Sequence, residues 1–194
     1  MLDFTNITIG FAVTGSFCTF DDAFRQARSL VQLGAKLIPV MSETAYYTDT
    51  RFGGAKERAD ELSEICGAEI IRTIADAEPL GPGKVLDVLL VCPCTGNTMA
   101  KLANSITDTP VTMAVKSHIR NNRPAVLSIA TNDALAGSAK NMGALMNLRN
   151  YFFVPLRQDD SANKPASLVS DFMRIPETVE HALRGTQLQP VIFS

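Results

Sequence analysis

Short apolar runs alternate with segments in which apolar residues recur every three or four positions, and this alternation extends over most of the chain. Compact apolar runs between polar turns predict buried strands, whereas recurrence at helical spacing predicts amphipathic helices. The runs that favour strands lie at residues 8–13, 36–41, 68–71, 85–91, 124–130 and 151–154. The segments that favour helices lie at residues 21–33, 55–66, 99–106, 110–119 and 134–148.

Strands that alternate with helices predict a doubly wound parallel α/β sheet of about six strands. A chain of 194 residues is long enough for one such domain, and no internal repeat or linker divides it. After residue 155 a polar loop at 157–165 precedes two short helices, at 166–173 and 177–184, and an apolar tail. We therefore predict a single domain over residues 1–194 with a C-terminal extension from about residue 156.

Small and polar residues follow four of the predicted strands. They occupy residues 14–16, 42–44, 94–97 and 131–132. Right-handed crossovers bring the carboxyl ends of parallel strands to one edge of a sheet, where open α/β proteins bind their ligands. Four polar strand ends on one rim therefore predict a ligand site, although any one such loop taken alone is more often an ordinary connection.

The segment from residue 91 to 108 has the strongest pattern of a strand, a tight loop and a helix. Thr95 and Asn97 are both suited to cap that helix, and either side chain is also able to turn toward a ligand. The first strand ends similarly, in Thr14-Gly15-Ser16 before a helix, where backbone amides are able to hold a phosphate. Ser42, after the second strand, either reaches the same phosphate or simply begins a loop.

The glycine spacing around the first loop limits the kind of phosphate ligand. The motif is Gly-x-x-x-x-Gly-Ser from residue 10, which is neither the dinucleotide fingerprint nor a P-loop, since it lacks the P-loop lysine. A mononucleotide phosphate fits this pattern better than a dinucleotide.

The polar and aromatic loop at residues 46–54 contains one cation, Arg51, which either binds a substrate carboxylate or is solvated. Charged candidates on the same rim are Glu43, Asp49 and Asp133, each equally suited to a solvated loop. No catalytic acid or base is identified from the sequence.

Composition excludes several functional classes. The net charge of −2 gives no electrostatic footprint for nucleic acid, and no apolar run approaches the length of a bilayer span. A cationic group at residues 116–123 is either a basic patch or the C-terminus of a helix, where the dipole favours cations.

The Cys92-Pro93-Cys94 turn lacks the second pair that a zinc site requires, so no metal is expected. Without a visible signal peptide we expect reduced thiols and a cytoplasmic protein.

Three motifs together resemble the flavin-binding family of phosphopantothenoylcysteine decarboxylase and the peptide cysteine decarboxylases. They are Gly10 with Thr14-Gly15-Ser16, the segment PCTGNTMAKLA at 93–103 with Asp108, and Ala130-Thr131-Asn132. The resemblance implies a Rossmann-like (flavodoxin-like) three-layer fold, bound FMN and assembly through trimers. It implies a phosphate site and a flavin site formed by Thr14, Gly15, Ser16, Ser42, Thr95, Asn97 and Asn132.

The chain departs from the decarboxylase pattern at three places. No histidine occurs at residues 76–84, shortly before the fourth strand, and IATN at 129–132 replaces Pro-Ala-Met-Asn. The segment 158–165 lacks the cysteine and glycines of a substrate clamp. A stand-alone cysteine decarboxylase is therefore not expected.

Over its whole length the chain resembles the B subunits of dipicolinate synthase from spore-forming bacteria. The stretches that carry this resemblance are TDTRFG at 48–53, AEPLGP at 77–82, NNRP at 121–124 and PETVEHAL at 176–183. The resemblance implies a two-subunit oxidoreductase that converts a dihydrodipicolinate-type dicarboxylate to dipicolinate during sporulation. The A subunit of the synthase is then the partner and carries NAD(P).

Two roles for this chain fit that resemblance. It is either an FMN-binding subunit that takes part in the oxidation, or an assembly subunit that kept the fold without flavin. The apolar residues 191–193 near the end of the sequence, together with the trimer habit of the family, predict a homo-oligomer.

Overall fold

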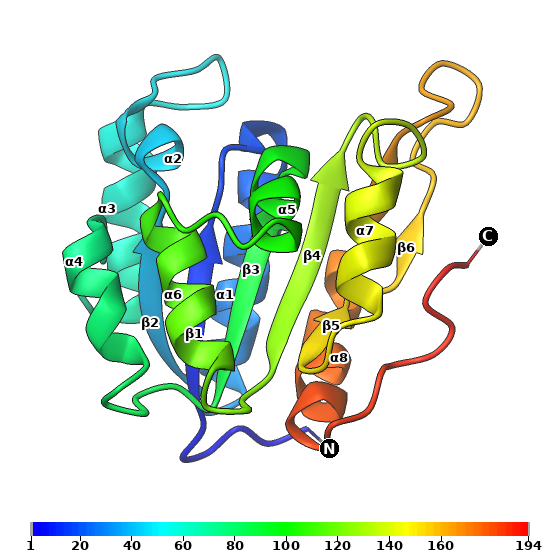
Figure 1. The fold of residues 1–194 in the computed structure, drawn as a ribbon. Helices are drawn as coiled ribbons and strands as arrows, with labels where there is room; N and C mark the ends of the chain where they lie inside the picture. Colours follow the sequence, from blue (N-terminus) through cyan, green and yellow to red (C-terminus); the bar gives the residue numbers. More distant parts are fainter. Residues whose placement is uncertain (1, 194) are drawn as a thin grey trace.

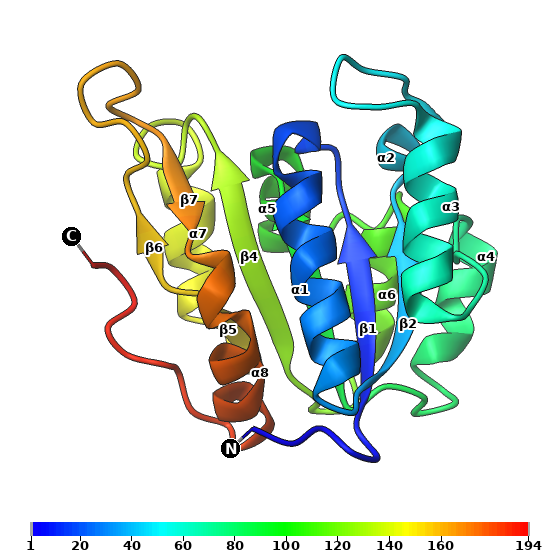
Figure 2. The same ribbon diagram turned by 180° about the vertical axis from the view of Figure 1, so that it is seen from behind.

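The computed structural model describes residues 2–193. Figure 1 shows a three-layer α/β fold in which a central sheet separates two layers of helices. Seen from behind in Figure 2, α1, α3 and α8 cover one face of the sheet, whereas α4, α5, α6 and α7 lie on the other. This is the Rossmann-like three-layer arrangement that the sequence predicts.

The sheet has seven strands in the order β2-β1-β3-β4-β7-β6, with β5 paired to β4 beside this path. The first five strands pair in parallel with one another, whereas β7 is antiparallel to both β4 and β6. Their bounds are β1 Thr8–Val13, β2 Lys36–Met41, β3 Val88–Cys94, β4 Ala125–Thr131, β5 Tyr151–Phe153, β6 Leu156–Arg157 and β7 Leu168–Ser170.

The helices connect these strands across the two faces of the sheet. Their bounds are α1 Phe20–Gln32, α2 Glu43–Tyr47, α3 Ala55–Cys66, α4 Ile74–Ala77, α5 Gly96–Ala103, α6 Pro110–Ile119, α7 Ala139–Met146 and α8 Ile175–Leu183. Short 3-10 turns occupy Phe17–Thr19, Glu78–Leu80 and Phe172–Arg174.

Elements with strong local signals lie where the sequence predicts them. The first two strands have the predicted bounds, and α3 ends at Gly67, whose φ of 60° is left-handed. Helix α6 begins after Thr109, which forms a reciprocal capping box with Thr112.

Three predicted elements are wrong. Residues 68–71 form no strand, because only Ile71 pairs with β2, through a single bridge to Val40. Residues 166–173 are not a helix: residues 168–170 form β7, whose pairing with the end of β4 outweighs weak local preference. The helix predicted from residue 134 begins only at Ala139, because residues 133–138 fold into turns that contain Gly137.

The fourth predicted strand is also displaced. Residues 85–87 precede the strand, and β3 continues through Cys92, Pro93 and Cys94, with a shift of register against β4 between Val91 and Cys94. The two cysteines are therefore parts of a buried strand rather than a turn.

Two apolar clusters fill the space between the sheet and its helices. Alternate residues of β1 face opposite layers, so Phe11 belongs to the same cluster as Phe24 of α1, whereas Ala12 belongs to the cluster of Met99 and Val111 on the other face. A parallel sheet covered on both sides leaves the loops at its carboxyl edge as the accessible part of the strands.

His118 on α6 is buried rather than one of several solvated cations at the helix end. The residue is only 1% exposed, and Nε2–H donates to the carbonyl of Pro124 at 3.0 Å. Burial lowers the pKa of this imidazole to about 4, from 6.5. The folded protein therefore holds His118 neutral over a range in which the unfolded chain protonates it.

We expect His118 to make the fold less stable in mild acid. Because the folded pKa is below the unfolded one, its contribution is complete above pH 6.5 and is lost as pH falls toward 4. The loss amounts to about 2 kcal/mol at pH 5. Urea unfolding at pH 7 and pH 5 measures it, with His118→Gln as the control that keeps a donor but does not titrate. An equal pH dependence in wild type and variant would contradict this expectation.

Candidate functional site

A cleft of about 420 Å³ opens at the carboxyl edge of the sheet. It lies where the turn after β1, the start of α5, the end of β4 and the β6–β7 hairpin meet, with one side chain from the loop before α3. The lining residues are Gly15, Ser16, Phe17, Cys18, Thr19, Phe52, Thr95, Gly96, Ala130, Thr131, Asn132, Asp159, Lys164, Ser167, Leu168 and Val169. Its volume suits a small organic ligand.

The cleft brings together four of the residues that the sequence places in a cofactor site. Gly15, Ser16, Thr95 and Asn132 all line it, although they come from three different strand ends. Thr14, Ser42 and Asn97 are not among the lining residues.

Thr14 joins the turn after β1 to the turn after β3, two of the segments that line the cleft. It is 1% exposed, and its hydroxyl donates to the carbonyl of Pro93 at 2.7 Å while accepting from the amide of Thr95 at 3.0 Å. The turn after β1 is thereby fixed against the turn after β3, which sets the width of the cleft between them.

Ser42 and Asn97 occupy helix termini beside the cleft. Ser42 is buried and caps α2, since its hydroxyl accepts from the amide of Ala45 at 3.3 Å. Asn97 is exposed in the first turn of α5, whereas Thr95 is the residue that caps that helix. Of the two possible caps that the sequence offers for α5, Thr95 is the one that caps, and Asn97 does not. Ser42 caps a short helix where the sequence predicts either a phosphate contact or the start of a loop.

The turn after β1 presents unpaired backbone donors to the cleft. The amide of Ser16 is paired, since it donates to the carbonyl of Thr14 at 2.8 Å, and the side chain of Ser16 lies among the residues that line the cleft. The amides of Gly15, Phe17 and Cys18 find no acceptor within residues 2–193. These donors lie at the start of the helical run that continues into α1, where the positive end of the helix dipole favours an anion.

The segment at the end of β4, which forms another wall of the cleft, carries hydrogen-bond acceptors rather than donors. Asp133 accepts from the hydroxyls of Thr131 at 2.6 Å and Ser138 at 2.9 Å, and these bonds lower the pKa of its carboxyl. Because the Thr131 proton is used in this way, its oxygen offers only lone pairs to the cleft. The three oxygens converge above Gly96, where an added Cβ would lie 2.8–3.0 Å from them.

The charges of the cleft come from the hairpin between β6 and β7. Lys164 is the single cation of its described lining, and Nζ lies 3.2 Å from Oδ2 of Asp159. The Ser167 hydroxyl and then Lys164 lower the pKa of the Asp159 carboxyl. An anion in this cleft would therefore depend mainly on backbone amides rather than on free cations.

Sequence reasoning missed the hairpin residues and did not single out Phe52. Lys164 and residues 167–169 reach the cleft because β7 pairs antiparallel with the end of β4, and nothing in the local pattern shows this pairing. Phe52 belongs to the aromatic loop at 46–54, whose composition was the available signal.

The thiols differ sharply in accessibility. Cys18 is exposed in the cleft, whereas Cys92 and Cys94 are buried in β3. Burial raises the pKa of Cys94 and of Cys66 to about 12. Across residues 2–193 no three metal-binding side chains gather in one place, and no helix in this range is long and apolar enough to cross a bilayer.

The family model described as Flavoprotein matches residues 3–174. The chain belongs to the flavoprotein family. This flavoprotein is 47% identical over 184 residues to the B subunit of dipicolinate synthase from Bacillus subtilis (strain 168), covering 95% of this chain and 92% of that protein. The resemblance to such B subunits that the sequence motifs indicate is therefore confirmed.

Solved structures agree with this assignment. The crystal structure of the B subunit of dipicolinate synthase from Bacillus halodurans C superposes with a TM-score of 0.92 at 41% identity, over 100% of this chain and 99% of that one. The FMN-dependent cysteine decarboxylase SpaF shares the fold, with a TM-score of 0.69 at 20% identity over 92% and 98% of the two chains. The Rossmann-like fold class is confirmed.

Proposed function

We propose that this flavoprotein binds FMN in the cleft and serves as the B subunit of dipicolinate synthase. In this role it acts in the cytoplasm of a sporulating bacterium with the A subunit of the synthase, which binds NAD(P). Together they oxidise a dihydrodipicolinate-type dicarboxylate to dipicolinate. The observation that carries the proposal is the row of unpaired amides at Gly15, Phe17 and Cys18, three residues that line a cleft at the ligand-binding edge of the sheet.

The residues of the cleft fit FMN. The amides after β1 and the Ser16 hydroxyl would hold the phosphate, since they supply directed donors and the positive end of a helix. Thr95 and Asn132 would lie along the rest of the cofactor. Because Gly96 has no side chain, the oxygens of Thr131 and Asp133 pack closely against it at this edge of the cleft, where a Cβ would lie 2.8–3.0 Å from them.

Each group of this chain then has a defined task in the reaction. When bound, a flavin supplies an acceptor and donor of hydride. The Thr131 hydroxyl donates its proton to Asp133, so toward the cleft it can only accept a hydrogen bond, from an N–H or O–H group of a bound ligand. Asp133 stays ionised at neutral pH, since its pKa is lowered, so it positions hydroxyls rather than donating a proton.

The second candidate function is that of an assembly protein without flavin, which joins the A subunit of the synthase to further copies of this chain in a trimer-based oligomer. The observation that favours it is that Thr14, Ser42 and Asn97 do not line the cleft. It requires a colourless protein that still activates the A subunit. Light scattering that gives a monomer mass would remove the homo-oligomer.

The sequence predicts an oligomer partly because residues 191–193 are apolar, but in the structure this tail is largely paired within its own chain. Leu156 pairs with the tail on both sides, donating to Val191 at 2.7 Å and accepting from Phe193 at 3.1 Å. Only Ile192, 61% exposed, projects as a large apolar side chain of this segment.

We expect FMN to bind the purified chain and to protect Cys18 from alkylation. Titration with FMN should change the flavin spectrum with saturation, and the same FMN concentrations should slow modification of Cys18 by iodoacetamide, because this thiol lies in the cleft. Cys18→Ser is the control: it should be alkylated slowly with or without FMN, because Cys92 is buried and burial raises the pKa of Cys66 and Cys94 to about 12. Neither spectral change nor protection at millimolar FMN would remove the flavin proposal.

A further inference from the structure

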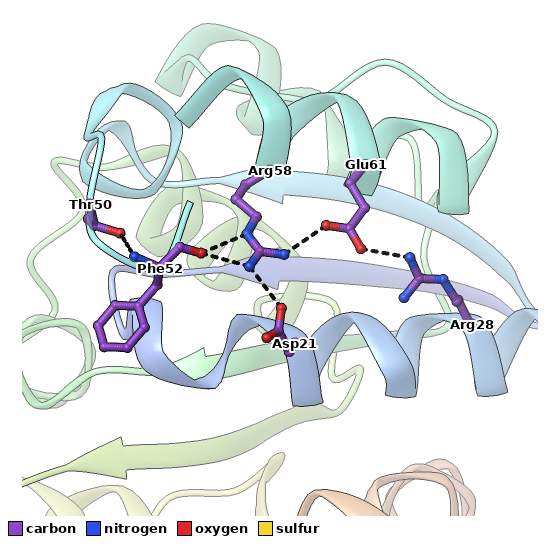
Figure 3. Close-up of polar contacts among 6 residues, drawn as sticks. All are labelled: Asp21, Arg28, Thr50, Phe52, Arg58 and Glu61. Carbon is purple, nitrogen blue, oxygen red and sulfur yellow. Dashed lines mark hydrogen bonds and ion pairs between the residues drawn. The ribbon is translucent and has the colours of Figure 1, made fainter. Parts of the chain in front are cut away.

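Arg58 of α3 holds the loop that carries Phe52 (Figure 3). Its guanidinium donates from Nε and from one terminal nitrogen to the carbonyl of Phe52, at 3.2 Å and 2.7 Å. The same group pairs with Asp21 of α1 at 2.9 Å and with Glu61 at 3.0 Å, and Glu61 in turn pairs with Arg28 at 2.7 Å. Two helices and the loop are therefore joined through one guanidinium that is 19% exposed.

The loop is also closed on itself. Thr50 and Gly53 exchange backbone hydrogen bonds of 3.2 Å, and the Thr50 hydroxyl accepts from the amide of Phe52 at 3.1 Å. Asp49 accepts from the first amide of α3 at 2.8 Å. Gly53 has a φ of +133°, and a Cβ there would lie 2.7 Å from Nε of Arg58. These hydrogen bonds fix the conformation of the loop, which also requires the close approach of Arg58 to Gly53.

Arg51 projects from this fixed loop without an acidic partner. Its guanidinium carbon lies 4.8 Å from the centre of the Phe52 ring, and no ion pair of Arg51 occurs among the described residues. Stacking on an aromatic face orients a guanidinium but leaves its N–H edges available for a carboxylate. Phe52 lines the cleft, and the oriented cation of Arg51 lies against the ring of this lining residue, although Arg51 itself is not among the residues that line the cleft.

The cations around the cleft are therefore not equivalent. Lys164 faces Asp159 at 3.2 Å, so its charge is already compensated. Arg51 is uncompensated and carries the planar fork that matches a carboxylate in two parallel hydrogen bonds.

We infer that Arg51 binds one carboxylate of the dicarboxylate substrate, and that Arg58 is a positioning residue that holds Arg51 and Phe52 in place for this contact. The inference rests on the proposed function, since it names the substrate contact of the same cleft. Of the two alternatives for Arg51, a solvated side chain and a carboxylate ligand, the stacked and oriented guanidinium favours the second.

Calorimetric titration with pyridine-2,6-dicarboxylate tests the role of Arg51. We expect Arg51→Gln to weaken binding at least tenfold, and Arg51→Lys to recover only part of the loss because lysine keeps the charge without the fork. Both variants should fold, since Arg51 is exposed. Affinities within twofold of each other in wild type and Arg51→Gln, or no binding to the wild type, would overturn the inference.

A double-variant cycle tests the role of Arg58. If Arg58 acts through Arg51, then Arg58→Gln weakens dicarboxylate binding severalfold, and adding it to Arg51→Gln causes no further loss. Additive losses would show that Arg58 serves the fold alone. Urea unfolding of Arg58→Gln establishes that the folded state is populated during the titration.

FMN titration separates this inference from the proposed function. Arg51→Gln should bind FMN with wild-type affinity, because the proposed phosphate donors are backbone amides and the Ser16 hydroxyl, none of which this substitution removes. Dicarboxylate binding that depends on Arg51 in a protein that takes up no FMN would remove the flavin proposal alone. FMN binding with dicarboxylate affinities unchanged by Arg51→Gln would remove the present inference alone.

Discussion

Replacing Gly81 with alanine should lower the free energy of unfolding by about 3 kcal/mol. Gly81 follows the 3-10 turn at 78–80 and packs directly on the backbone of α6. An added Cβ would lie 2.2 Å from the carbonyl oxygen of Ser117 and 2.6 Å from its carbon. Because both atoms belong to the helix backbone, no rotation of a side chain relieves the clash, and α4 must move away from α6.

The matched control for this change is Gly143→Ala in α7. No atom lies within 4 Å of a Cβ at Gly143, and alanine favours a helix interior over glycine. Gly143→Ala should therefore be neutral or raise stability by up to about 1 kcal/mol. Urea unfolding of both variants measures the difference, and a Gly81→Ala midpoint equal to that of the wild type would show that Gly81 does not lie so close to the backbone of α6.

The second large effect concerns the proposed phosphate site. Gly15→Asp should weaken FMN binding by about 100-fold or more, because its carboxylate would compete for the amides of Phe17 and Cys18 and repel the phosphate. One lost charged hydrogen bond accounts for about 1.5–3 kcal/mol, and like-charge repulsion adds to it. Ser42 has no part in this expectation, because it is buried and does not line the cleft.

Gly15→Ala is the control for the Gly15→Asp variant. Its Cβ would lie 3.2 Å from Cγ2 of Thr44, a small adjustment, and it adds no charge. FMN titrations followed by flavin fluorescence should give Gly15→Ala an affinity much nearer to the wild type than to Gly15→Asp. Equal affinities of wild type and Gly15→Asp would mean that the phosphate lies elsewhere.

Local signals account for the parts of the fold that the sequence predicts well. The first two strands are long apolar runs bounded by turn residues, and Thr109 with Pro110 specifies the start of α6 through capping and a fixed φ. The loops after β1 and β3 meet in the cleft because parallel topology leaves few alternatives.

The parts that the sequence did not reveal depend on distant contacts. Residues 168–170 become a strand because the end of β4 offers free backbone groups, and this places Ser167 and Lys164 in the cleft. Ser42 caps a helix of five residues that composition alone does not distinguish from a loop. The loop that presents Arg51 is held through Arg58 and its partner on another helix, a contact that no local pattern indicates.

The backbone of Leu156 in β6 pairs with the tail at residues 191–193. Other irregular segments pair in a similar way with strands at the borders of the sheet. Gln187 bonds both backbone groups of Phe153 through its side-chain amide, and Ile71 bonds β2 through Met41 and Pro39. Exposed strand borders are templates on which other chains add in register, as in fibrils. Irregular segments here pair with part of each border, which leaves fewer free backbone groups for another chain to bind. We therefore expect copies of this chain that associate to do so mainly through side chains of helices and loops, in a contact whose geometry depends on the particular residues.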